Sequence, residues 1–164
     1  MIATYDDAAI FGLVDIAAYP TFVSDNWTLD SITGHFAANA GSIVVFTGGQ
    51  GGFGTVDVEL HVGVTPVTGF REFQAPITVT AGTLHIASYT ALTMAAQFQD
   101  ETLPGFREGK AVFEVPNGSY VARIIQTVDP SDAAAVKTLD ETHPLFIIEL
   151  EPGTTEPIAP IVWL

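Results

Sequence analysis

The chain has 164 residues, 48% of them hydrophobic, and it carries nineteen Asp and Glu against five Lys and Arg, for a formal net charge of -14. A surface with this charge repels the phosphates of nucleic acids and of anionic membranes, and it favours basic partners. The chain has no cysteine, which excludes disulfides, thiol nucleophiles and cysteine-ligated zinc.

The negative net charge reflects a shortage of Lys and Arg rather than an excess of Asp and Glu. Charged residues make up 15% of the chain, against about 25% in an average domain, so the sequence does not indicate a DNA mimic. The acids either form a recognition surface or keep the chain soluble by self-repulsion. The length fits one domain over residues 1–164. The chain begins without the basic patch of a secretory signal, so we expect a cytoplasmic, soluble protein, with export by another route left open.

The first third of the chain combines strand patterns with one helical pattern. We expect strands over residues 10–17 and 42–46, and one short helix near residues 28–38. Thr28 is a suitable N-cap, and Ile32 and Phe36 lie four residues apart on one helix face. Residues 48–54 are rich in glycine but lack the Lys of a phosphate-binding loop, so they predict a flexible hairpin loop.

Residues 55–62 show the clearest strand pattern. Apolar and polar residues alternate strictly, which places Asp57, Glu59 and His61 together on one face. A half-buried strand of an antiparallel sheet typically shows this pattern.

Strand patterns continue through the second half. We expect strands over residues 73–79, 83–89 and 145–150, the last without alternation and therefore central in its sheet. Residues 110–115 and 119–128 flank Pro116-Asn117-Gly118, which predicts a β-hairpin with Gly118 at positive φ. Residues 131–139 predict either a second helix capped by Ser131 or a loop. The predicted fold class is all-β: an antiparallel β-sandwich with one short helix.

No catalytic constellation is visible in the sequence. The four histidines lack the spacing of a zinc site, so we expect no metal, no cofactor and no enzymatic activity. Two alternatives stay open. An enzyme would need His61 or His85 in a cleft beside a carboxylate, and a small-molecule-binding sandwich or barrel would need a cavity lined by Phe residues.

Three groups of short motifs follow one another along the chain: Asn26-Trp27-Thr28, Ile32, Ala37-Ala38, Gly41 and Ile43; then Val79-Thr80, Gly82, His85-Ile86 and Ser88; then Phe113, Pro116, Gly118, Tyr120 and Thr127-Val128. In their order and rough spacing over residues 27–128, these motifs resemble the competence protein J family. The best-known member of that family is a small acidic inhibitor of a DNA-entry nuclease, and it acts by protein–protein binding. The resemblance therefore implies a non-enzymatic role.

We therefore expect an acidic binding protein of the inhibitor or immunity type, with a basic protein such as a nuclease as its partner. Four carboxylates are the expected contacts. Asp57 and Glu59 lie on the exposed face of the strand over residues 55–62, and Asp100 and Glu101 lie on the long connection over residues 98–109. Their role would be to pair with Arg or Lys of the partner.

Overall fold

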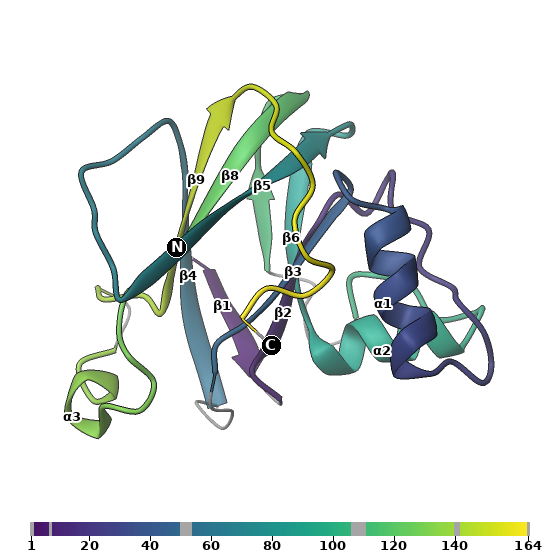
Figure 1. The fold of residues 1–164 in the computed structure, drawn as a ribbon, viewed down its shortest axis with the longest axis horizontal. Helices are drawn as coiled ribbons and strands as arrows, with labels where there is room; N and C mark the ends of the chain where they lie inside the picture. The colour runs from purple at the N-terminus through teal and green to yellow at the C-terminus, as the bar shows by residue number, and fades with distance from the viewer. Residues whose placement is uncertain (1, 7, 50–53, 106–110, 140–141, 164) are drawn as a thin grey trace.

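Two β-sheets face each other and enclose the main core (Figure 1). The computed structural model describes residues 2–6, 8–49, 54–105, 111–139 and 142–163. The larger sheet has the strand order β1 (Ile2–Asp6), β4 (Gly54–Val62), β9 (Phe146–Pro152), β8 (Gly118–Gln126) and β5 (Arg71–Val79). The smaller sheet has the order β3 (Ile43–Thr47), β2 (Ile10–Val14), β6 (Thr83–Ser88) and β7 (Val112–Glu114).

Three helices lie outside the two sheets: α1 (Leu29–Ala38), α2 (Tyr89–Gln97) and α3 (Ala133–Val136). α1 and α2 pack together on the side of the smaller sheet, whereas α3 lies at the opposite end, in the connection from β8 to β9 (Figure 1). No helix in the described ranges is long and apolar enough to cross a membrane.

The predicted β-sandwich is confirmed. No strand with a predicted counterpart extends beyond its predicted range by more than two residues, and β9 is central in its sheet as predicted. β1 has no counterpart among the predicted strands. One pair departs from the antiparallel rule, because β4 and β9 run parallel. Alternation along a strand reports which face is buried and carries no information on the direction of the neighbouring strand.

The helices differ from the prediction in number. α1 forms as predicted, with Thr28 and Ser31 in a reciprocal capping box. α2 was missed: the strand predicted to reach Tyr89 ends at Ser88, whose hydroxyl accepts a hydrogen bond from the amide of Ala91 and caps a new helix. α3 forms within residues 131–139, with Asp132 rather than Ser131 as its cap.

Two connections predicted as hairpins instead cross between the sheets. β7 pairs with β6 in the smaller sheet, whereas β8 pairs with β5 and β9 in the larger sheet. The side chain of Asn117 accepts a hydrogen bond from the amide of Gly82 at 2.6 Å, and Gly118 begins β8 without the predicted positive φ. Residues 48–54 likewise join β3 to β4 in the other sheet, and residues 50–53 lie outside the described ranges. Turn residues predict a change of direction but not which strand the chain then joins.

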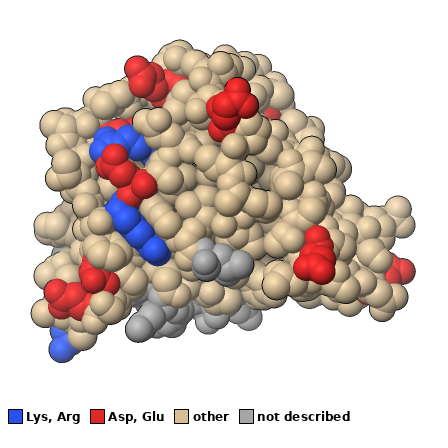
Figure 2. All heavy atoms as spheres, in the orientation of Figure 1, with Lys and Arg blue, Asp and Glu red and all other residues tan. Residues whose placement is uncertain are grey.

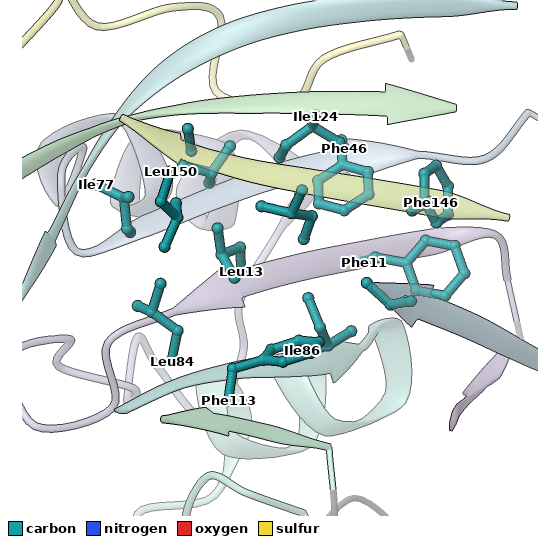
Figure 3. Close-up of a cluster of buried hydrophobic side chains, with 14 of the residues drawn as sticks. Phe11, Leu13, Phe46, Ile77, Leu84, Ile86, Phe113, Ile124, Phe146 and Leu150 are labelled. Atoms are coloured by element: carbon teal, nitrogen blue, oxygen red, sulfur yellow. The ribbon is translucent and has the colours of Figure 1, made fainter. Parts of the chain in front are cut away.

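Aliphatic and aromatic side chains fill the space between the sheets (Figure 3). Phe11, Phe46 and Phe146 are fully buried, and the centres of their rings lie 5.1 to 6.0 Å apart. These rings contact one another rather than line the cavity expected of a small-molecule-binding sandwich. A second apolar cluster joins the smaller sheet to α1 and α2 and fixes both helices in place; it includes Val14, Ile32, Phe36, Leu92 and Leu103.

Candidate functional site

The first predicted acidic pair lies on the outer face of the larger sheet. Asp57 and Glu59 are both partly exposed on β4, as expected. A carboxylate oxygen of Glu59 lies 3.3 Å from Nε2 of His61 on the same exposed face. Asp57 borders a pocket of about 240 Å³ that is also lined by Leu139 and Leu145. This face therefore offers two carboxylates to a partner, and that of Glu59 already lies beside His61.

Beside this pair, the larger sheet carries a closed charge network. Arg123 on β8 forms ion pairs with Glu149 on β9, at 2.8 Å, and with Glu72 on β5, at 2.5 Å. The connection between β4 and β5 covers them: the amide of Thr65 donates to Glu149 at 2.7 Å, and Arg123 donates to the carbonyl of Val67 at 3.2 Å. As a result Glu149 is only 1% exposed.

The hydrogen bonds of this network offset the cost of burial. Burial acts to raise the pKa of Glu149, but hydrogen bonds from Thr65 and Arg123 hold that pKa below its ordinary value. Hydrogen bonds to Glu72 and Glu149 raise the pKa of Arg123. Both carboxylates of this network already pair with Arg123, so the network stabilises the covering connection, and Glu149 is too buried to contact a partner.

Arg71 is also held within the structure. Its Nε donates to the side chain of Gln126 at 2.7 Å, and a terminal nitrogen donates to the carbonyl of Thr47 at 3.1 Å. Its guanidinium carbon lies 4.1 Å from the centre of the Trp163 ring. Of the three Lys and Arg in the described ranges, which are Arg71, Arg123 and Lys137, two are thus engaged with the chain itself.

The second predicted acidic pair lies at the other end of the molecule, after α2 (Figure 1). Asp100 and Glu101 are exposed. The connection that carries them is ordered by backbone hydrogen bonds, since the amide of Phe98 donates to Met94 and the amide of Glu101 donates to Phe98. Leu103 then enters the second apolar cluster. The structure does not bring the two predicted pairs together, because they lie on opposite layers.

The segment before α1 and the first turn of α1 each add an acid that was not predicted as a site residue. The amides of Val23 and Ser24 both donate to the carbonyl of Ala96, and the side chain of Gln97 donates to the carbonyl of Asp25. Asp25 therefore lies beside the end of α2, and Asp30 lies in the first turn of α1. Both are exposed.

These segments contain acids without bases. Residues 16–42 and 89–105 include neither Lys nor Arg. In the view of Figure 2, the end of the molecule with α1 and α2 shows acidic side chains and no Lys or Arg, whereas blue and red groups alternate on the opposite side. The acids here therefore have no Lys or Arg within their own segments to pair with.

Large apolar side chains are exposed in the same segments. Leu29 is 59% exposed, and Phe22, Met94 and Phe98 are 38 to 41% exposed. We call the combined region the helical-layer surface. It consists of Phe22, Asp25, Leu29, Asp30, Met94, Phe98, Asp100 and Glu101.

A pocket of about 130 Å³ opens between α1 and α2 at this surface. Its lining is mainly apolar and comes from both helices, the segment before α1, β2 and the segment after β9. The pocket was not predicted from the sequence because α2 was not predicted. The lining residues are Ile10, Trp27, Leu29, Ile32, Phe36, Tyr89, Leu92, Thr93 and Ile161.

The histidines do not form a site. They lie on separate elements: His35 on α1, His61 on β4, His85 on β6 and His143 before β9. Within the described residues, no group of three or more His, Asp or Glu side chains could hold a metal ion. His85 has a buried Nδ1 without a hydrogen-bond partner, and burial lowers its pKa while the carboxylate of Asp15 acts in the opposite direction.

Comparison with known proteins finds two solved structures with a similar fold. No family model matches the sequence, and no curated protein matches it. A solved structure described as crocagin biosynthetic gene J is similar over 92% of this chain and 96% of its own, with a TM-score of 0.60 and 19% identity. The structure of ComJ from Bacillus subtilis, described as an inhibitor of the DNA-degrading activity of NucA, is similar over 93% of this chain and 99% of its own, with a TM-score of 0.49 and 15% identity.

The family that the sequence motifs resemble is represented among these similar structures by ComJ. At 19% identity, the likeness to the crocagin protein shows a shared fold and nothing about function, since one fold can carry several functions.

Proposed function

We propose that this chain is a non-enzymatic acidic binding protein, that its partner is a basic nuclease, and that it inhibits this nuclease or gives immunity to it. The observation that carries the proposal is the helical-layer surface, where exposed apolar side chains lie among carboxylates in segments without Lys or Arg. We further propose that the protein acts in the cytoplasm.

The physical case for a basic protein partner has two parts. Carboxylates without nearby bases create a negative field, which speeds the encounter with a positive surface and disfavours nucleic acid. Exposed apolar side chains supply the area that a protein interface removes from water, and carboxylates around them form its polar rim. The motifs that resemble the competence protein J family support a nuclease as the basic partner, because an acidic protein docked on the phosphate-binding cleft of a nuclease would exclude DNA.

Within this proposal the four predicted acids take different places. Asp100 and Glu101 belong to the helical-layer surface and are proposed as direct contacts. Asp57 and Glu59 lie apart from this surface, on the larger sheet. Glu59 already has His61 as its neighbour, so we propose this pair as a separate and smaller acidic site.

The test is inhibition of DNA degradation by basic nucleases of the source organism, together with calorimetric affinities at two salt concentrations. Inhibition that weakens as salt rises supports the proposal. A failure of every basic nuclease to bind the chain would overturn it.

Three double variants with the same change of charge locate the surface: Asp100→Asn with Glu101→Gln, Asp57→Asn with Glu59→Gln, and Glu151→Gln with Glu156→Gln. All six side chains are at least partly exposed. We expect the first variant to weaken binding by roughly tenfold, as the loss of two charge-assisted contacts would, and the third to leave it nearly unchanged. Equal losses in all three would show that only the overall charge matters and would argue against a defined surface.

A further inference from the structure

We propose that the pocket between α1 and α2 receives one large apolar side chain of the partner, and that Lys or Arg residues flanking this side chain pair with the acids of the helical-layer surface. The inference rests on the proposed function and deepens it, since it names the feature that the chain recognises: a single apolar residue within a basic segment.

The size of the pocket selects a side chain rather than a larger ligand. Its volume is about 130 Å³. An apolar cavity of about 150 Å³ holds one benzene molecule, whereas pockets for drug-sized ligands span roughly 300 to 1,000 Å³. One aliphatic or aromatic side chain therefore matches the available space.

The pocket has a fixed floor and an open mouth. Ile32 of α1 and Leu92 of α2 are each 3% exposed and belong to the second apolar cluster, so their positions are set by packing before any partner arrives. Leu29, at 59% exposed, lies at the mouth. A preformed apolar pocket lowers the cost of ordering on binding, and such pockets are where the strongest contacts of protein interfaces concentrate.

The charges of the helical-layer surface select the residues that flank the bound side chain. Asp30 follows Leu29 directly, and Asp25 lies two residues before Trp27, which also lines the pocket. Asp100 and Glu101 lie after α2, on the connection that begins with the exposed Phe98. Because residues 16–42 and 89–105 contain no Lys or Arg, a basic segment is complementary to this surface and an acidic one is repelled.

Three capped pentapeptides test the inference directly: Lys-Lys-Leu-Lys-Lys, Lys-Lys-Ala-Lys-Lys and Glu-Glu-Leu-Glu-Glu. Binding is followed by the nitrogen–proton NMR signals of the full chain, in which the indole of Trp27 reports on the pocket and a Trp163→Phe variant assigns the two indole signals. We expect the basic Leu peptide to shift Trp27 and the amides of α1 and α2. The Ala peptide should bind roughly tenfold more weakly, since it buries less apolar area, and the acidic peptide should not bind.

Variants of the pocket supply the control. Thr93 also lines it and is partly exposed, so Thr93→Phe should fill the pocket and abolish the preference for Leu over Ala. Thr93→Val keeps the volume of the side chain and should preserve that preference. Leu29→Ser alters the exposed mouth without touching the floor, so it should fold normally and reduce the affinity for the Leu peptide even if Thr93→Phe fails to fold.

Equal affinity for the Leu and Ala peptides would overturn the inference, as would shifts centred on β4. Shifts of Trp27 by toluene, with none by the basic peptides, would overturn it in favour of a small-molecule site. If a nuclease is inhibited equally by the parent chain and by Thr93→Phe, the pocket inference fails and the proposed function stands. If the basic Leu peptide binds the pocket but no nuclease binds the chain, the proposed function fails and the pocket inference stands.

Discussion

Carboxylates occur on both layers of this molecule, and their surroundings give them opposite roles. On the larger sheet, Glu72 and Glu149 both pair with Arg123, and a covering connection buries Glu149. On the helical layer, the carboxylates are exposed among apolar side chains in segments without bases. A formal charge of -14 therefore says little about recognition by itself. What matters is whether each acid has a partner within the chain.

The largest expected effect on stability comes from removing Arg123 from its network with Glu72 and Glu149. Arg123→Met should destabilise the fold by about 3 kcal/mol, because it leaves a buried carboxylate without its counter-charge. Urea unfolding measures this. Glu72→Gln is the control, since it removes only the more exposed partner and should cost less than about 1 kcal/mol. Equal losses in the two variants would show that burial of Glu149 does not govern the network.

The packing of the connection between β4 and β5, which covers the network, can be tested at Gly69. A Cβ at Gly69 would lie 2.4 Å from the carbonyl oxygen of Gln126 and 2.5 Å from a methyl group of Ile125. Gly69→Ala should therefore displace the covering connection and cost about 2 kcal/mol. Gly34→Ala on α1 is the matched control: it meets no atom within 4 Å and should stabilise the helix by roughly 0.5–1 kcal/mol. Thermal unfolding distinguishes the two, and a neutral Gly69→Ala would contradict the close packing of Gly69 against β8.

The half-buried imidazole of His85 on β6 predicts a pH dependence. Burial lowers the pKa of His85 in the folded chain, so the unfolded chain binds more protons below its ordinary pKa of about 6.5. Stability from this residue is complete above that pH and decreases as the pH falls below it. Urea unfolding at several pH values should show this decrease in the parent chain and a smaller one in His85→Gln. The same slope in both would exclude His85 as its source.

The smallest effect on stability is expected on the helical layer. Asp100→Asn with Glu101→Gln should change the free energy of unfolding by less than about 0.5 kcal/mol, because both side chains are exposed and act on no buried group. Calorimetric unfolding checks this beside the binding assay. A large loss of stability would mean that these acids serve the fold, and the contrast between the two layers would disappear.

Local patterns predicted the strands and α1 because their causes are local. The alternation over residues 55–62 reports which face is buried, and the reciprocal bonds of Thr28 and Ser31 span only three residues. α2 was not predicted, although Ser88 is a suitable cap, because the β-rich run before it extends through Tyr89. The hairpin at Pro116-Asn117-Gly118 was wrong, since pairing partners are chosen across the whole sheet. Asp100 and Glu101 are exposed, and their role as partner contacts stays a prediction. Asp25 and Asp30 came into view only through the contact of Asp25 with α2 and the position of Asp30 on α1.

The sequence by itself determined the β-rich class, the apolar core positions and the uneven distribution of bases, because composition and periodicity are properties of the chain. Only the tertiary structure decided which acids are closed in and which are exposed. Glu149 and Thr65 are 84 residues apart and Arg123 and Glu72 are 51 apart, so their pairing depends on strands brought together by folding. The pocket likewise exists only where α1 and α2 meet, because a cavity is formed by the packing of distant segments.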